Sequence, residues 1–230
     1  MLGRHHVIER FLGLYPSPAY LEIGVNKGET FHALRAPRKV AVDPQFLFDV
    51  NAYLVPGVAD FYQCTSDQYF GTIADPGKPF DVIFIDGLHT FEQSLRDLLN
   101  ALAHLAPGGV IVLDDTIPAS FDASISDMHE AFALRDSAAR SGANWPHDGS
   151  WMGDVFKLVF FIESFCQTLS YASVQESHGQ TVVWRRTREA TSVGLRSVEQ
   201  VARLDYRDTI QHREVFKIRP FEQIIGEFKS

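Results

Sequence analysis

The chain has 230 residues, 45% of them hydrophobic, which is enough to bury one core with some additional elements. Its 21 basic and 29 acidic residues give a formal net charge of −8 at pH 7, so no overall positive field attracts nucleic acid or an anionic membrane. We therefore expect a small neutral or cationic partner, and neither nucleic acid nor a membrane.

The cysteines and the hydropathy pattern favour a cytoplasmic protein. Cys64 and Cys166 are too few for a disulfide framework, and their spacing is not that of metal ligands. No signal peptide is visible, and the most apolar run, VFKLVFFI at 155–162, is shorter than the roughly 20 residues that cross a bilayer. We expect a protein of the reducing cytoplasm.

Short apolar runs alternate with helical patterns through about residue 115, which predicts a parallel sheet with helices on both faces. Helices are expected near 28–35, 66–74 and 90–105. The last begins with the capping-box spacing of Thr90 and Gln93 and is expected to stop at Pro107-Gly108-Gly109. The predicted strands are Tyr20–Ile23, Lys39–Val42, Val58–Cys64, Asp81–Ile85 and Val110–Leu113.

The pattern changes after residue 115. A polar stretch at about 116–153 has no strand-like run, and we predict that it is a lid loop. Asp154 is expected to cap a helix through VFKLVFFIESF, and LSYASVQE and TVVWRR are expected to form an antiparallel pair that completes the sheet. Residues 189–230 predict a helical tail that packs on the domain or forms a homo-oligomer.

The stretch YLEIGVNKGET places Glu22, Gly24 and Gly28 at the first strand-to-helix turn, where open α/β sheets bind nucleotides. A dinucleotide fingerprint needs glycine at positions 26 and 29, which are Asn26 and Glu29 here. The Glu29 carboxylate would repel a pyrophosphate at the helix N-terminus. The pattern therefore argues against NAD as the ligand. Tight packing between the strand and the helix is an alternative explanation for Gly-x-x-x-Gly.

An acidic residue followed by Gly-x-x-x-Gly resembles the first motif of class I S-adenosylmethionine-dependent methyltransferases. Asp43, 19 positions after Gly24, matches the acidic residue that holds two ribose hydroxyls in that family, and Ser66 and Asp67 match the polar residues near adenine. The resemblance implies a doubly wound, mostly parallel seven-stranded sheet of the Rossmann-like methyltransferase type, with the last strand antiparallel. Carboxylates also suit a ligand that carries a sulfonium, an ammonium and a ribose but no phosphate.

Three carboxylates follow two neighbouring strands: Asp86 ends FDVIFID, and Asp114 and Asp115 end GGVIVLDD. Parallel strands bring such residues to one edge of the sheet, where the carboxylates repel one another unless they take up protons or share a cation. No Lys or Arg lies beside them in the sequence, so we predict a divalent ion, Mg²⁺ or Mn²⁺. Any one of the three could instead be a turn former or a helix cap.

This trio resembles the metal-dependent O-methyltransferases of the macrocin and novobiocin sugar type, over about residues 18–186. The resemblance implies Asp86, Asp114 and Asp115 as metal ligands, with Asp86 also at the cofactor and in catalysis. Some members carry a general-base aspartate two positions after the first ligand, where this chain has Leu88. We expect His89 to replace it, because a neutral imidazole can accept a proton, although His89 could equally be a helix-cap residue.

These features predict a methyltransferase domain at 1–188 that methylates a hydroxyl of a small molecule, such as a sugar or a catechol-like ring. A metal-independent small-molecule methyltransferase and a non-catalytic cofactor-binding scaffold are the alternatives. Trp145, His147 and Trp151 reach the cofactor side only if the lid folds over it, and helix capping or a solvated end explains Asp154 and Lys157 without a function.

Overall fold

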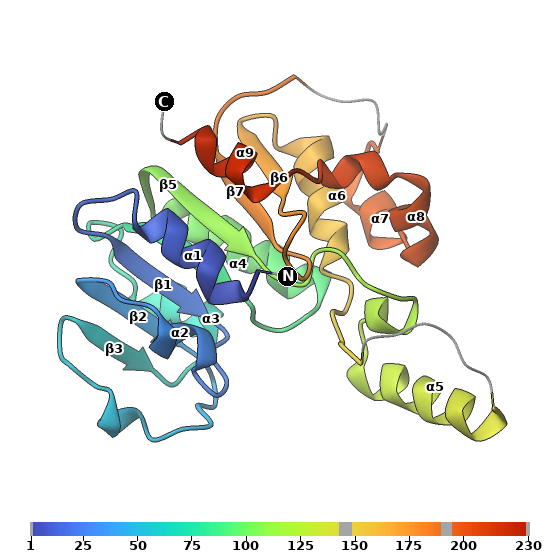
Figure 1. Cartoon of the computed structure of the whole chain (residues 1–230), viewed down its shortest axis with the longest axis horizontal. Coiled ribbons are helices and arrows are strands. Elements are labelled where there is room, and N and C mark those ends of the chain that lie inside the picture. Colours follow the sequence, from blue (N-terminus) through green and yellow to red (C-terminus); the bar gives the residue numbers. More distant parts are fainter. Residues whose placement is uncertain (1, 143–148, 190–194, 229–230) are drawn as a thin grey trace.

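The structure is a computed structural model, which describes residues 2–142, 149–189 and 195–228. Its centre is one seven-stranded sheet in the order β3-β2-β1-β4-β5-β7-β6 (Figure 1). β7 runs antiparallel to both of its neighbours, and the other strand pairs of the sheet are parallel, which confirms the predicted fold class. The strands are β1 (Ala19–Ile23), β2 (Arg38–Val42), β3 (Ala59–Tyr62), β4 (Phe80–Ile85), β5 (Leu105–Leu113), β6 (Leu169–Ser173) and β7 (Thr181–Arg185).

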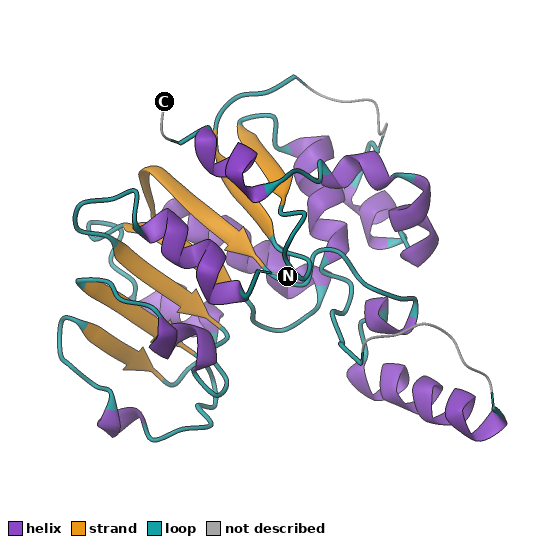
Figure 2. Ribbon diagram, in the orientation of Figure 1, coloured by secondary structure: helices purple, strands orange, loops and turns teal. Residues whose placement is uncertain are grey.

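Helices cover both faces of the sheet (Figures 1 and 2). One face carries α1 (Arg4–Leu12), α2 (Glu29–Ala33) and α9 (Phe221–Gly226). The other carries α4 (Phe91–Ala103), α6 (Phe156–Phe165) and α7 (Val198–Ala202), with η4 (Arg213–Phe216). The remaining helices are η1 (Val50–Ala52), α3 (Ser66–Gln68), η2 (Tyr69–Ile73), η3 (Asp122–Ser124), α5 (Met128–Ser141) and α8 (Tyr206–Gln211). No helix among the described residues is long and apolar enough to cross a membrane.

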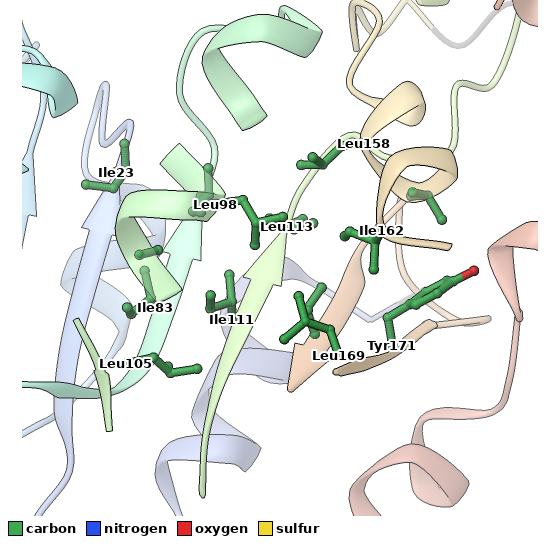
Figure 3. Close-up of a cluster of buried hydrophobic side chains, with 14 of the residues drawn as sticks. Ile23, Ile83, Leu98, Leu105, Ile111, Leu113, Leu158, Ile162, Leu169 and Tyr171 are labelled. Atoms are coloured by element: carbon green, nitrogen blue, oxygen red, sulfur yellow. The ribbon is translucent and has the colours of Figure 1, made fainter. Parts of the chain in front are cut away.

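The strands divide their side chains between two buried clusters because successive residues point to opposite faces. In β1, Leu21 and Ile23 join the cluster beneath α4 and α6, whereas Tyr20 joins the cluster beneath α1 and α9. Figure 3 shows the first cluster, with Ile83, Ile111 and Leu113 from the central strands facing Leu98 of α4 and Ile162 of α6. This packing fixes which side chains reach the carboxyl ends of the strands.

Two predicted helices are present but differ in detail. The helix expected at 66–74 is found at 66–73, where the three residues of α3 continue directly into the π-helix η2. The helix expected at 90–105 ends at Ala103, and Pro107-Gly108-Gly109 lies inside β5, where the register against β4 shifts. A shift in pairing tolerates proline and glycine within a strand, which the sequence pattern did not reveal.

The predicted lid also differs from expectation. Residues 116–153 contain η3 and the 14-residue helix α5, which projects away from the sheet (Figure 1). Asp127 caps α5 by accepting hydrogen bonds from the backbone N–H groups of His129 and Glu130. The apolar stripe of α5 is weak because only Ala131 and Ala138 are buried, so helical periodicity was hard to see.

The described part of the tail packs on the same chain. α9 buries Phe221, Ile224 and Ile225 against α1, and Arg219 pairs with β6 through the backbone bonds Arg219 N to Ser173 O and Gln175 N to Arg219 O. A homo-oligomer through this tail stays a prediction.

Candidate functional site

The first strand-to-helix turn lies beside the carboxyl end of β4. Gly24 has a φ of 82°, and a Cβ atom there would lie 1.9 Å from the carbonyl oxygen of Asp86. The turn is held from both sides, because Gly24 N donates to Val42 O and Asp86 N donates to Ile23 O. The predicted glycine is therefore required by a positive φ and by the close approach of two strand ends.

A cavity of about 1010 Å³ begins at this turn and reaches Asp86 at the end of β4. It joins the predicted cofactor residues to the predicted catalytic residues in one space. Its lining includes Glu22, Gly24, Asp43, Ser66, Asp86 and His89. Gly28 and Asp67, predicted for the same cofactor, are not among the lining residues.

Asp43 holds the first turn together. Its Oδ2 accepts hydrogen bonds from the backbone N–H groups of Val25 (2.7 Å) and Asn26 (2.8 Å), and its Oδ1 accepts one from Gln45 (2.7 Å). A carboxylate has about four lone-pair sites, so about one is left for a ligand. To bind two ribose hydroxyls, as the sequence predicts, Asp43 would have to accept the second one at an oxygen site that already takes a backbone N–H.

A polar network lies on the cavity wall next to β3 and α4. The Gln93 side-chain amide donates to Ser66 Oγ (3.1 Å), Asp97 Oδ1 (3.0 Å) and Asp67 Oδ1 (3.3 Å). Burial raises the pKa of Asp97, with its bonds to Ser66 and Gln93 opposing the rise. Ser66 lines the cavity, and its contact with adenine stays a prediction. Gln93 and Asp97 were not predicted as site residues because both lie within a helix.

Glu22 precedes the turn at the end of β1, and Gly28 follows the turn at the start of α2. Glu22 is fully buried and accepts a hydrogen bond from the Tyr20 hydroxyl at 2.6 Å. Burial raises the pKa of Glu22 to about 8. Gly28 precedes α2 with a φ of 77°, and a Cβ atom there would meet the His32 ring at 2.4 Å.

The structure brings Asp86, Asp114 and Asp115 together, with Asp114 fully buried and Asp115 almost so. It also brings Arg4 to all three. The Arg4 guanidinium forms a close ion pair with Asp114 through Nε, and its two terminal nitrogens lie 3.7 Å from Asp86 Oδ2 and 3.7 Å from Asp115 Oδ1.

The position of Arg4 contradicts one premise of the predicted metal site, namely that no basic residue lies beside the carboxylates. The prediction used the lack of a basic neighbour in the sequence, but α1 packs on the sheet so that its first residue reaches the strand ends. Burial, together with the charges of Asp86 and Asp115, still raises the pKa of Asp114 well above its ordinary value. One guanidinium therefore does not fully compensate the carboxylates.

His89 supplies the second cation. Its Nδ1 must carry a hydrogen, because it lies 3.1 Å from the carbonyl oxygen of Trp151, which can only accept. Its Nε2 lies 3.2 Å from both Asp86 Oδ1 and Asp115 Oδ2. A lone pair facing two carboxylates would be repelled, so Nε2 must carry a proton or face a metal ion.

The pKa of His89 agrees with a protonated imidazole. Burial alone would lower it, but the hydrogen bond to Asp86 and the charges of Asp115 and Asp86 raise it to about 9. The pKa of Asp115 is raised to about 6, mainly by burial and by Asp86. Two cations thus face three carboxylates, so one negative charge lacks a partner whenever all three carboxylates are ionised.

Residues 149–154 hold His89 in place. The Trp151 ring stacks on the His89 ring at 4.8 Å, and its Nε1 donates to Ile125 O. Gly153 has a φ of 59°, and a Cβ atom there would lie 1.7 Å from His89 O. Trp145 and His147 lie outside the described residues.

Asp154 and Lys157 are not among the residues that line the cavity. We expected Asp154 to cap the helix that follows it. Instead, its side chain accepts a hydrogen bond from the backbone N–H of Phe91 at the start of α4. The Lys157 ammonium pairs with Asp154 at 2.9 Å and donates to Ala202 O.

The cluster fits a divalent cation. One ligand atom each from Asp86, His89 and Asp115 lie within 4.8 Å of one another. Among the described residues, Oδ1 of the buried Asp114 has no hydrogen-bond partner, as expected of an acceptor that lacks its cation. The carboxylate oxygens are donors that Mg²⁺ and Mn²⁺ accept, and His89 Nε2 beside them can serve either as a further ligand or as a base.

Comparison with known proteins finds a family match over part of the chain. Residues 21–116 match the model of a family described as a methyltransferase domain. No curated protein matches the chain in sequence.

Solved structures share the fold at low identity. A candidate O-methyltransferase from Klebsiella pneumoniae has 17% identity and a TM-score of 0.50, and the match covers 81% of this chain and 82% of that one. A candidate caffeoyl-CoA O-methyltransferase from Staphylococcus aureus has 10% identity and a TM-score of 0.50, with 80% and 85% covered. MycE, a methyltransferase of mycinamycin biosynthesis solved with Mg and SAH, has 17% identity and a TM-score of 0.45, with 86% of this chain and 52% of MycE covered.

Proposed function

We propose that this enzyme, which carries a methyltransferase domain at residues 21–116, transfers the methyl group of S-adenosylmethionine to a hydroxyl of a small molecule and uses Mg²⁺ or Mn²⁺. The observation that carries the proposal is one cavity that joins the glycine turn to Asp86 and His89, whose ligand atoms lie within 4.8 Å of one from Asp115. A methyl donor bound at the turn and an acceptor bound at the carboxylates would meet within it.

The turn suits the donor. Gly24 lets the backbone approach the ligand, Asp43 has about one acceptor site left for a ribose hydroxyl, and Ser66 with Gln93 offers hydrogen bonds for adenine. Asp86 lies where the donor's cationic end would meet the carboxylate cluster. In this assignment Gly28 and Asp67 shape the site from outside the cavity.

We assign Asp86 and Asp115 as metal ligands, with Asp114 as the third carboxylate and His89 directly beside them. A divalent cation in this group supplies the positive charge that favours a deprotonated acceptor hydroxyl. The added charge would also oppose protonation of His89, and Nε2 could then accept the hydroxyl proton at neutral pH. Trp151 keeps that nitrogen pointed inward through its bond to Nδ1.

The acceptor end of the cavity indicates a partly apolar substrate. Leu88, Met128 and Trp151 line the cavity together with His89 and Asp86. Apolar walls with a few convergent polar groups are typical of small-molecule sites. A hydroxylated ring, either a sugar with apolar substituents or a catechol-like ring, meets this description.

Arg4 favours a second candidate, a methyltransferase without a metal. Its guanidinium already faces all three carboxylates, so the cluster could be organised by Arg4 and His89 alone. The acceptor would then be positioned by hydrogen bonds, and the reaction would not respond to a chelator.

Turnover with a labelled donor tests the proposal. The protein is incubated with S-adenosylmethionine and a panel of sugars and phenols, with Mg²⁺ or with EDTA. We expect methylation that EDTA abolishes and that falls at least about a hundredfold in Asp115→Ala, while donor affinity by calorimetry changes less than about threefold.

Methylation that persists in EDTA would refute the requirement for a divalent cation and would support the metal-independent methyltransferase. Donor binding with no methylation of any acceptor would instead indicate a cofactor-binding scaffold. No donor binding at all would refute the proposal as a whole.

A further inference from the structure

We propose that Arg4 is a built-in competitor of the divalent cation: its guanidinium compensates the carboxylate cluster in the ion-free protein and leaves the cluster when the cation binds. This inference rests on the metal-binding part of the proposed function. It adds a residue far from the cluster in sequence that sets how tightly the ion is held.

The contacts of Arg4 cover the whole cluster. Each of its three guanidinium nitrogens faces a different carboxylate: Nε faces Asp114, and the terminal nitrogens face Asp86 and Asp115 at 3.7 Å. His89 takes the opposite oxygens of Asp86 and Asp115. Every carboxylate of the candidate ion site is therefore in use by a cation of the chain itself.

Arg4 and a divalent cation oppose each other for two reasons. They carry like charges, and in this partly buried group the repulsion is weakly screened. They also compete for the fully buried Asp114, because the guanidinium takes its Oδ2 and leaves only Oδ1 open to an ion while Arg4 is in place. A buried carboxylate needs a partner, so one cation replaces the other instead of leaving the site uncharged.

The position of Arg4 allows it to leave. It is the first residue of α1, follows Gly3 with no side-chain cap, and its side chain is 43% exposed. The helix itself is anchored further along by Val7, Ile8 and Phe11, each fully buried. The guanidinium can therefore turn to solvent without unpacking α1.

Manganese binding without the methyl donor tests the inference. We measure the Mn²⁺ affinity of the chelator-treated protein by calorimetry and by electron paramagnetic resonance, for the wild type, Arg4→Gln and Arg4→Lys. We expect Arg4→Gln to bind Mn²⁺ at least about tenfold more tightly, equivalent to ~1.4 kcal/mol, and Arg4→Lys to gain less because it keeps the charge.

Arg10→Gln is the matched control. Arg10 lies on the same helix but pairs with Glu222 on the surface, so its loss should leave the Mn²⁺ affinity unchanged within about twofold. Melting curves give a second readout: saturating Mn²⁺ should raise the Tm of Arg4→Gln more than that of the wild type, because the tighter complex is stabilised more.

The outcomes separate the inference from the function. Equal or weaker Mn²⁺ binding by folded Arg4→Gln overturns the competition but leaves the metal site standing. Binding by Arg4→Gln and not by the wild type supports the competition in its strongest form. Binding by neither overturns both the competition and the metal, and methylation in EDTA then decides whether the enzyme works without an ion.

Discussion

At the scale of single residues, Arg4 decides how the acidic motif is interpreted. The sequence correctly indicated that Asp86, Asp114 and Asp115 meet, because strands of one parallel sheet end at one edge. It gave no sign of Arg4, which precedes Asp86 by 82 positions and reaches the cluster only through the packing of α1. A charge count along the chain therefore missed the cation.

His89 shows a second effect at this scale. Its position after Asp86 suggested a general base, but the Trp151 carbonyl fixes its tautomer, and the carboxylates raise its pKa to about 9. In the ion-free protein His89 is thus a cation, and a basic role depends on a further positive charge beside it.

Glu22 yields a prediction for pH dependence. Its folded pKa of about 8 lies above the value near 4.5 of the unfolded chain, so the folded form keeps a proton that the unfolded form loses between these pH values. The stability that depends on this proton is complete below about pH 4.5 and falls as the pH rises to about 8.

We expect Glu22→Gln to remove this part of the pH dependence. Relative to the wild type, its free energy of unfolding should rise by more than ~1.4 kcal/mol between pH 4.5 and pH 8, measured by urea denaturation. Glu9→Gln, at an exposed position of α1, should show no such change. Parallel pH curves for wild type and Glu22→Gln would mean that Glu22 ionises normally in the fold.

At the scale of elements, the segment after α5 connects the site to the sheet. Gly153 lies against His89 O, Trp151 lies against the His89 ring, and Asp154 accepts the Phe91 N–H that opens α4. Helix α4 and the His89 loop are therefore held by a segment more than 50 positions away. The free backbone N–H groups at the N-terminus of α4 are therefore bonded by the distant Asp154 as well as by the capping residue Thr90.

Asp154→Ala should destabilise this element. It leaves the buried Phe91 N–H without its acceptor, which costs about 1–3 kcal/mol of unfolding free energy, measured by urea denaturation. Asp154→Asn keeps an acceptor oxygen and should recover most of the loss. Equal losses in both variants would show that the Lys157 ion pair, and not the bond to Phe91, carries the effect.

At the scale of the whole molecule, the tail is part of the domain. α9 covers the same face of the sheet as α1, where the ring of Phe11 contacts those of Phe221 and Phe228 edge to face. Because α1 carries Arg4, the packing of the tail also supports the element that places a cation at the carboxylates.

Ile224→Ala should therefore lower the free energy of unfolding by about 2–5 kcal/mol, because Ile224 is fully buried and the substitution leaves a cavity. Ile210→Ala, on α8 with its side chain 64% exposed, should change it by less than about 0.5 kcal/mol. Both values come from urea unfolding of the full chain. A small effect at Ile224 would show that α9 is only loosely attached in solution.

The sequence by itself determined the sheet, its antiparallel last strand, the glycine turn and the meeting of the three carboxylates. These follow from local periodicity and from the rule that parallel strands end together, and both are encoded within short stretches. Tertiary structure alone decided the counter-ions, the tautomer of His89, the cap on Phe91 and the course of Pro107-Gly108-Gly109. Each depends on a contact between residues distant in the chain or on a shift in strand pairing, which no local pattern records.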